Sequence, residues 1–255
     1  MNTSRAAQRD YRGDRPSGSG LAARPERIRP AVVARAPAIE QTETLNWIDL
    51  AIAQLGPREF RRRLWHFAPG VLVLAGTAIP YREPVPIFLL TGAVLIGIGL
   101  VAAAIYCHHS IRRPGEQNGG QSIFGYGISV LPLFVLFPGQ VELALTVAGI
   151  IAFGDGCATV VGLMAGRTKL PWNCQKSWAG TAAFVLAAMP MAVLIYWCGA
   201  HPHPPFEIAA LCVAPAVLAS AVVETIPVRC NDNALVGASA AVAIIAMHGL
   251  VVGWS

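Results

Sequence analysis

The stretch from Leu143 to Ala165 reads LALTVAGIIAFGDGCATVVGLMA and decides the fold class. A helix needs about 20 mostly apolar residues to cross the hydrocarbon core of a bilayer. This run has that length, and Asp155 is its one charged residue. We therefore expect a membrane-spanning α-helix here, because only helices and closed barrels satisfy every backbone polar group in lipid.

Seven segments of the chain have the length and apolar character of spans. They are Leu64 to Pro80, Val85 to Tyr106, Ser122 to Pro138, Leu143 to Ala165, Ser177 to Cys198, Phe206 to Val223 and Ala234 to Trp254. The alternating pattern that an outer-membrane barrel needs, at a spacing of about ten residues, is missing. Charged residues make up 13% of the chain, against about 25% in soluble domains. The sequence therefore predicts an all-α, multi-pass integral membrane protein with about seven transmembrane helices.

Lys and Arg residues near the span ends predict the orientation, since positively charged loops stay in the cytoplasm. With a cytoplasmic N-terminus, Arg82 is the one cation on the far side of the membrane. The cytoplasmic side then holds Arg58, Arg61, Arg62, Arg63, Arg112, Arg113, Arg167, Lys169, Lys176 and Arg229. The loops after spans two, four and six therefore face the cytoplasm, where nucleotides are available.

Two parts of unlike composition make up the chain. Residues 1–45 carry eight Arg among Pro, Gly and Ser, without a hydrophobic face, and predict a disordered cytoplasmic tail. Residues 46–255 form the membrane domain, and its first segment, up to Gly56, fits either an interfacial helix or a helix packed on the bundle. The net charge of +5 points to lipid headgroups rather than nucleic acid, because no aromatic residues are interleaved with the Arg residues on a folded face. The sequence holds no signal for the number of subunits.

Asp155 is the residue that most needs a functional explanation. A carboxylate inside a span costs about 2.5–3.5 kcal/mol on insertion scales, so a compensating group is expected. Gly154 and Gly156 flank it and loosen the helix, which is tolerated at depth where the chain lines a polar cavity. Gly162 and Gly166 continue its helical face as small residues, which permit close helix approach or leave room for a ligand. The alternative is a carboxylate paired with a neighbouring helix for packing alone.

A cluster of cations follows in the cytoplasmic segment from Gly166 to Thr181, where Arg167, Lys169 and Lys176 lie one loop away from the buried carboxylate. A carboxylate that holds a divalent metal, beside cations that neutralise phosphate oxygens, is what phosphoryl or nucleotidyl transfer requires. Taken alone, a positive loop is also an ordinary topology signal, and Ser177 is placed to cap the fifth span. Neither a P-loop nor a Rossmann motif is present.

The last cytoplasmic loop adds further polar residues. Glu224 closes the sixth span, while Asp232 and Asn233 open the seventh. An N-cap explains Asp232 or Asn233 but not Glu224, so we favour a second carboxylate cluster that shares a metal with Asp155 or accepts a proton. At the first span, His66 is a candidate base or phosphate ligand, although a lone interfacial histidine is more often neither.

In their order and spacing, these residues resemble the phytol kinase and dolichol kinase family of integral-membrane lipid kinases. The matching blocks are Gly154-Asp155-Gly156-x-Ala158, Gly162 with Gly166, Lys176-Ser177-x-Ala179-Gly180-Thr181, and Glu224 with Asp232-Asn233. At the first span, Arg62-Arg63-x-x-His66-x-x-x-Gly70 is similar to the family's R-K-x-x-H…G pattern. The resemblance covers roughly residues 58–245, and the tail lies outside it. Asn231 and Gly237 depart from the family pattern, which often has Asp and Pro there.

Family members use CTP with a divalent metal to phosphorylate a long-chain isoprenoid or lipid alcohol. The resemblance thus implies a CTP-dependent kinase that uses Mg²⁺ and acts on a prenyl or other lipid alcohol in the bilayer. It implies a metal site made by Asp155, Glu224 and Asp232. It implies nucleotide-binding roles for Lys176, Arg167, Lys169, Ser177, Gly180 and Asn233. Asp155, Asp232 and His66 are the implied catalytic residues, with Asp232 and His66 as alternatives for the general base.

Two alternative functions stay open. The wider superfamily includes the phosphatidate cytidylyltransferases, which use a similar nucleotide pocket to join CMP to a lipid phosphate. Their comparable block reads Lys-Lys-Thr-x-Glu-Gly, and Ala179 stands here in place of that Glu, which favours the kinase. A transporter or non-catalytic scaffold also accounts for seven spans and a buried Asp, but it does not predict the cytoplasmic cluster of Asp, Lys and Asn.

Overall fold

The structure is a computed structural model that describes residues 56–78, 86–106, 119–228 and 231–254. The predicted disordered tail and all of the predicted interfacial helix except Gly56 lie outside these ranges and stay predictions. Four of the cations used for the orientation also lie outside them, namely Arg82, Arg112, Arg113 and Arg229.

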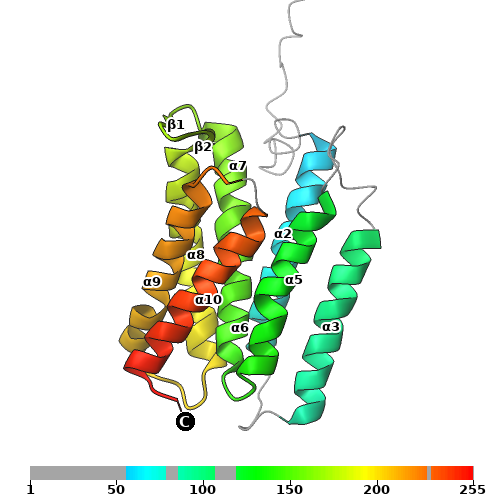
Figure 1. The fold of residues 1–255 in the computed structure, drawn as a ribbon, viewed down its shortest axis with the longest axis vertical. Coiled ribbons are helices and arrows are strands. Elements are labelled where there is room, and N and C mark those ends of the chain that lie inside the picture. The colour runs from blue at the N-terminus through cyan, green and yellow to red at the C-terminus, as the bar shows by residue number, and fades with distance from the viewer. Residues whose placement is uncertain (1–55, 79–85, 107–118, 229–230, 255) are drawn as a thin grey trace, which may run out of the picture. The chain divides into compact units, whose positions relative to one another are not determined.

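Within these ranges the chain forms helices and one short hairpin (Figure 1). The first three helices are α2 (Pro57–Gly76), α3 (Ile87–Tyr106) and α5 (Gly119–Leu136). The next segment consists of α6 (Val141–Gly149), the π-helical turn η1 (Ile150–Asp155) and α7 (Gly156–Ala165). The strands β1 (Lys169–Leu170) and β2 (Asn173–Ser177) pair antiparallel. The last helices are α8 (Trp178–Gly199), α9 (Phe206–Thr225) and α10 (Asp232–Val251).

Each of the seven predicted spans overlaps a helical segment of the described chain, with ends shifted by at most seven residues. Four helical segments are long and apolar enough to cross a membrane, namely Val141–Ala165, Trp178–Gly199, Phe206–Thr225 and Asp232–Val251. The apolar stretches in α3 and α5 are shorter. The structure therefore supports an α-helical membrane protein, while the count of seven spans and the orientation stay predictions.

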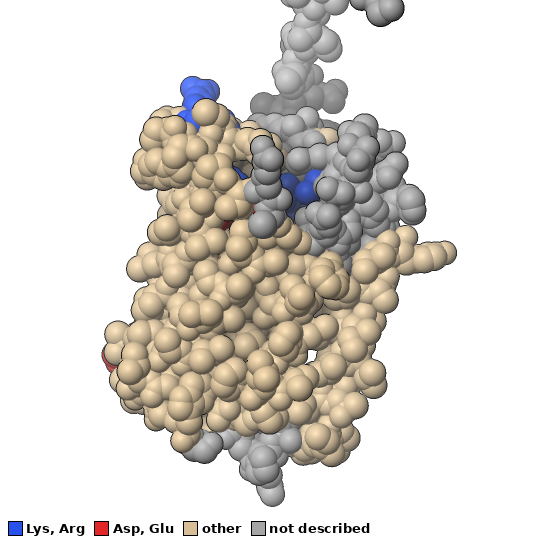
Figure 2. All heavy atoms as spheres, viewed as in Figure 1, with Lys and Arg blue, Asp and Glu red and all other residues tan. Residues whose placement is uncertain are grey.

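Many large apolar side chains on the outside of the helices are exposed. Leu186 is 76% exposed, Val242 70% and Leu250 81%. Soluble monomers rarely expose contiguous apolar patches of more than a few hundred Å². In Figure 2 most described charged side chains on the visible face gather at one end of the helices, and apart from one acidic spot near the other end the rest of the visible described surface is uncharged. This distribution is the one expected of helices whose outer faces contact lipid.

The segment α6–η1–α7 lies at the centre of the helix bundle. Leu143, Val147, Ile150 and Ile151 are fully buried there, and the segment packs against α2, α5, α8 and α10. Successive helices alternate in direction, so the start of α2, the β1–β2 hairpin and the start of α10 lie at one end, whereas α3 lies at the edge beside α5 (Figure 1). The alternation brings several predicted cytoplasmic loops to the same end.

Candidate active site

Asp155 is the last residue of the π-helical turn η1. The Gly-Asp-Gly sequence was expected to loosen the helix, and the structure confirms this, because the α-helical pattern changes there over six residues. Turns of this kind are rare and frequently occur at functional sites. The extra residue in the turn interrupts the regular ladder in the middle of the most buried segment. The side chain of Asp155 lines a cavity in the bundle.

The two glycines that flank Asp155 allow neighbouring helices to come close. A Cβ on Gly154 would lie 2.6 Å from the Phe184 ring of α8, and one on Gly156 would lie 2.7 Å from the Phe67 ring of α2. Both distances are shorter than real contacts, so any side chain here would push one of the rings away. The glycines therefore set how closely α2 and α8 enclose the carboxylate.

We expect Gly154→Ala to lower the free energy of unfolding by about 1–3 kcal/mol, because overpacking of a filled core has this cost. The displaced Phe184 ring should also lower activity. Gly99→Ala in α3 is the matched control, since a Cβ there meets no described atom within 4 Å. Chemical unfolding of both variants in detergent measures the effect, and equal stabilities would contradict the packing role of Gly154.

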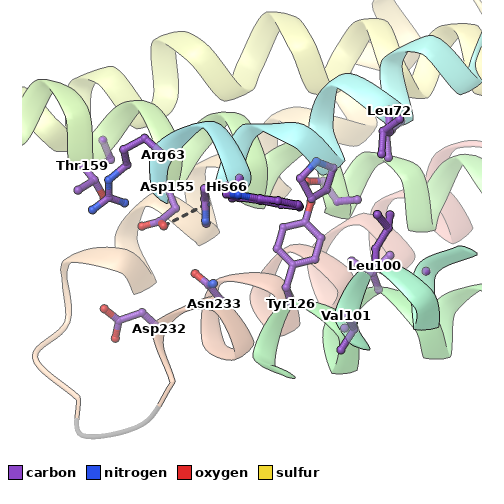
Figure 3. A pocket seen from close by; sticks show the side chains of 18 of the residues that line it. Arg63, His66, Leu72, Leu100, Val101, Tyr126, Asp155, Thr159, Asp232 and Asn233 are labelled. Carbon is purple, nitrogen blue, oxygen red and sulfur yellow. Dashed lines mark hydrogen bonds and ion pairs between the residues drawn. The ribbon is translucent and has the colours of Figure 1, made fainter. Parts of the chain in front are cut away.

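His66 of α2 pairs with Asp155. Its Nε2 lies 3.2 Å from Asp155 Oδ2 (Figure 3) and 3.2 Å from the carbonyl oxygen of Ile151. Both partners are acceptors, so Nε2 carries the hydrogen and the neutral ring keeps its lone pair on Nδ1. The imidazole also makes an edge contact with the Tyr126 ring, with centroids 6.4 Å apart. His66 thereby supplies the partner that a carboxylate at this depth requires.

Lys176 of β2 lies between two other carboxylates. Its Nζ donates to Glu224 Oε1 at 2.5 Å and lies 3.6 Å from Asp232 Oδ2. Glu224 is at the end of α9 and is 5% exposed, and Asp232 opens α10. The hairpin is held in place by Asn173, whose side chain donates to the Thr225 carbonyl oxygen at 3.0 Å. The loop lysine is thus fixed against the ends of two helices.

The carboxylates keep Lys176 charged. Burial alone would lower the pKa of this ammonium group, but the attraction of Glu224, Asp155 and Asp232 outweighs burial and raises the pKa above its ordinary value. A lysine in this state presents a fixed positive charge to the cavity, which suits binding of phosphate oxygens.

Two helix N-termini face the same region. Ser177 is the N-cap of α8 and accepts from the Gly180 N–H at 3.1 Å, as the sequence predicted. The N-cap of α10 is Asn231, which accepts from the Asn233 N–H at 3.0 Å, so the expectation of Asp232 or Asn233 as the cap is wrong. Because Asn231 caps the helix, the Asp232 side chain is free to face the cavity. Helix N-termini favour bound anions through their backbone N–H groups and dipole.

The small residues after Asp155 serve close packing against α8. A Cβ on Gly166 would lie 2.5 Å from Ser177 Oγ, and a Cβ on Gly180 would lie 2.8 Å from the Ala158 carbonyl oxygen. Gly180 lines the cavity, but its N–H is taken by Ser177. Of the two explanations left open by the sequence, close helix approach is the one realised at Gly166.

One cavity of about 900 Å³ collects most of the predicted residues. Its polar part contains His66, Asp155, Lys169, Lys176, Ser177, Gly180, Glu224, Asp232 and Asn233. Arg167 is exposed and is not among the lining residues, so the structure does not bring it to the site. Figure 3 shows Asp155, Asp232 and Asn233 beside the same space, although they come from different helices.

The three carboxylates predicted to share a metal do not form one cluster. Within residues 56–78, 86–106, 119–228 and 231–254, no three His, Cys, Asp or Glu side chains are close enough to hold a metal ion together. Glu224 instead pairs with Lys176, so the structure gives it a different partner from the one expected. Asp155 and Asp232 both still line the cavity. Mg²⁺ commonly uses one or two protein carboxylates together with substrate phosphates, and this pair fits that requirement.

The sequence analysis did not identify several residues of the cavity. Tyr126 lines it, and its hydroxyl donates to the Ala148 carbonyl oxygen at 2.6 Å. Gln175 and Thr181 also line it, next to Lys176 and the start of α8. Tyr126 could have been identified as a cavity residue from the sequence, because it is a tyrosine within an apolar segment. Gln175 could be identified only from its place in the hairpin.

The cavity also has a large apolar part that continues from the polar part without a break. Its walls are formed by side chains of α2, α3 and α5, including Leu72, Leu100 and Val101. In Figure 3 these three residues lie on the opposite side of Tyr126 from Asp232. A site with fixed charges at one end and apolar walls at the other can hold an anion and the tail of an amphiphile together.

Comparisons with known proteins point to one family. The chain is 29% identical over 194 residues to a wheat (Triticum aestivum) protein named probable phytol kinase, chloroplastic. The aligned region covers 71% of this chain and 64% of that protein. It is 27% identical over 200 residues to a maize (Zea mays) probable phytol kinase, covering 72% of this chain and 65% of that one. It is 28% identical over 113 residues to phytol kinase 1 of Arabidopsis thaliana, covering 42% of this chain and 37% of that one. The matched region thus spans less than two thirds of each relative. No family model and no solved structure matches the chain.

Proposed function

We infer that the chain is a homologue of the phytol kinases, as its motifs predicted. On this premise we propose that it is an integral-membrane kinase that transfers a phosphoryl group from CTP to a prenyl or other long-chain lipid alcohol. The observation that carries the proposal is the single cavity in which carboxylates and cations adjoin apolar walls. Phosphoryl transfer depends on positioning and charge stabilisation, and a lipid acceptor must bring its hydroxyl to that charged end.

In the proposed arrangement seven helical segments cross the bilayer and the N-terminus is cytoplasmic. The end of the bundle that carries the β1–β2 hairpin and the start of α10 then faces the cytoplasm, because the Lys and Arg residues favour that side. CTP reaches the cavity from water at this end, and the alcohol reaches it from the bilayer.

Lys176 is the main contact for the triphosphate in this proposal. Its charge is fixed by the neighbouring carboxylates, and the N-terminus of α8 adds backbone dipoles on the same side. The Ser177 oxygen accepts from Gly180, which leaves its hydroxyl hydrogen to donate to a phosphate oxygen. Lys169 and Asn233 line the cavity and contribute further donors. Arg167 acts from outside the cavity by attracting the nucleotide.

Asp155 and Asp232 would hold Mg²⁺, which when bound neutralises charge on the phosphate oxygens. Glu224 has the separate task of holding Lys176 in position through their ion pair. This division leaves Lys176 to face the nucleotide while Asp155 and Asp232 line the space between nucleotide and acceptor.

His66 is the general base in our proposal, in preference to Asp232. Its Nε2 hydrogen is directed to Asp155 and the Ile151 carbonyl oxygen, so Nδ1 has the free lone pair. The hydroxyl oxygen of the alcohol forms a bond to the γ-phosphorus of CTP, and the bond from that phosphorus to the β,γ-bridging oxygen breaks. The hydroxyl proton passes to His66 Nδ1, and CDP leaves.

We expect His66→Gln to lower kcat by about 10²- to 10⁴-fold, the usual contribution of a general base. The Gln side-chain amide can still donate to Asp155 in place of Nε2, so the variant removes the base and keeps the hydrogen bond. Steady-state kinetics with CTP and a prenyl alcohol measures the loss. Activity within a few-fold of the wild type would show that His66 serves only to position Asp155.

The proposed reaction is tested by following each phosphate of the nucleotide. Purified full-length protein in liposomes receives Mg²⁺, a prenyl alcohol and CTP labelled at either the γ- or the α-phosphate. We expect label in the lipid from the γ position alone. Label from the α position would identify a cytidylyltransferase, and no lipid label from either, with phosphatidate also supplied, would reject both enzymes and favour a transporter or scaffold.

A further inference from the structure

The apolar part of the cavity is a groove between α2, α3 and α5, which we call the tail groove. Its lining residues are Pro69, Leu72, Val73 and Gly76 of α2; Phe88, Leu89, Gly92, Ala93, Ile96, Gly97, Leu100 and Val101 of α3; and Gly127, Val130, Leu131 and Phe134 of α5. The lining positions of α3 run from Phe88 to Val101, which at 1.5 Å per residue is about 20 Å. The groove is thus a long channel rather than a small pocket beside the charged site.

The groove begins at the polar part of the cavity. Arg63 and His66 occupy the turns of α2 before Pro69, and Tyr126 occupies the turn of α5 before Val130. No charged side chain lies among the groove residues. An occupant must therefore have a polar head near His66 and Asp155 and a tail without polar groups.

The size of the cavity favours an occupant with one tail. A volume of about 900 Å³ is in the range of pockets that hold one drug-sized ligand, and the polar part takes a share of it. A lipid with two acyl chains would need a second groove, whereas a single isoprenoid chain needs only this one.

Glycines on the groove wall differ in their surroundings. A Cβ on Gly97 would lie 2.7 Å from Leu131 Cδ2, and one on Gly127 would lie 3.1 Å from Val101 Cγ2, so both serve the packing of α3 on α5. A Cβ on Gly92 meets no described atom within 4 Å, although Gly92 lines the groove. The space beside Gly92 is therefore open and belongs to the groove.

We propose that the tail groove binds the isoprenoid chain of the acceptor alcohol and that Gly92 keeps open the half of the groove that is farther from the polar part. The proposal rests on the proposed lipid-alcohol kinase activity and assigns the place of the tail. It differs from a path along the small residues after Asp155, of which Gly166 packs against the start of α8 and Gly162 lines the polar part of the cavity. A larger side chain at Gly92 would stop a long tail partway and leave room for a short one.

The test is Gly92→Leu, with Gly99→Leu as the control on the same helix. Gly99 also meets no described atom within 4 Å, but it does not line the cavity. Activity is measured with geraniol, farnesol, geranylgeraniol and phytol. We expect kcat/KM of Gly92→Leu to fall about tenfold or more for the two longest alcohols, the effect of a filled hydrophobic pocket, and to change little for geraniol. Gly99→Leu should keep the wild-type profile.

The proposal would be overturned if kcat/KM of Gly92→Leu depended on chain length as in the wild type. It would also be overturned if Gly92→Leu were as stable as Gly99→Leu but lost the same share of kcat/KM for every alcohol. Gly92→Ala covers the case in which Gly92→Leu fails to fold, with a smaller loss expected in the same order of chain lengths.

A second measurement does not depend on catalysis. Geranylgeraniol carrying a photoreactive diazirine at its tail end is cross-linked to the full-length wild type and to both Leu variants, and the labelled peptides are identified. We expect label on α2, α3 and α5 in the wild type and in Gly99→Leu, with strong reduction in Gly92→Leu. Label elsewhere would reject the tail groove even in an active kinase. Label in the groove of a protein that phosphorylates no alcohol would retain the groove and reject the kinase.

Discussion

Asp155→Asn is expected to reduce phosphoryl transfer by about 1000-fold or more while the protein stays folded and membrane-inserted. The substitution keeps the size of the side chain and removes its negative charge, and loss of metal-based charge stabilisation is worth several kcal/mol in the transition state. The amide can still accept from His66 Nε2, so the contact between α2 and η1 is kept. Activity assays and thermal unfolding in the same detergent separate the two effects.

Glu207→Gln is the matched control for Asp155→Asn. Glu207 is an exposed carboxylate in the first turn of α9, away from the cavity, and its loss should leave activity unchanged. If Asp155→Asn retained activity within tenfold of the wild type, Asp155 would not belong to the active site. The carboxylate would then serve only in its pair with His66.

Lys176→Met is expected to lower kcat/KM for CTP by about 100-fold or more, the usual cost of removing one donor to a developing charge. The KM for the alcohol should change little, because the tail groove does not include Lys176. Loss of the ammonium also leaves Glu224 without its ion pair at a position where it is 5% exposed. The double variant Lys176→Met with Glu224→Gln should therefore recover stability but not activity.

The raised pKa of Lys176 adds a pH dependence with a definite sign. The charged Lys176 side chain contributes to the free energy of unfolding in full below the ordinary lysine pKa of about 10.4. This contribution is lost as pH rises through the higher pKa of Lys176 in the folded state. The pH profile of CTP binding should thus show no decline from Lys176 below about pH 10.

The control for Lys176→Met is Arg61→Met, which removes an exposed cation of α2 outside the cavity and should bind CTP like the wild type. Equal CTP affinities in Lys176→Met and Arg61→Met would contradict the assigned role.

Much of the fold could be predicted from the sequence. Uncharged runs of about 20 residues leave the backbone no alternative to helix in lipid, so each predicted span overlaps a helix. The Gly-Asp-Gly sequence also predicted a loosened helix, and the cap at Ser177 followed from the preference for Ser at this position. These features depend on residues that are neighbours in the chain.

The partners of the site residues could not be predicted in the same way. Asp155, Glu224 and Asp232 were expected to share a metal because all three are carboxylates at the same end of the spans. In the structure they line one cavity but have different partners, since the hairpin brings Lys176 against Glu224 and α2 brings His66 against Asp155. The identity of each partner depends on how helices rotate and approach one another, and the sequence pattern does not contain that information.

By itself the sequence determined that this is a helical membrane protein, that its charged residues of opposite sign gather near the same ends of the spans, and that its motifs resemble those of phytol kinases. Only the tertiary structure decided which of those residues share a cavity and where the apolar groove lies. The physical reason is range: hydrophobicity and capping act within a few residues, whereas the contact between Lys176 and Glu224 joins positions 48 residues apart and the one between His66 and the Ile151 carbonyl joins positions 85 apart. The second contact also depends on Gly156, which lets the Phe67 side of α2 come close to the segment that carries Asp155.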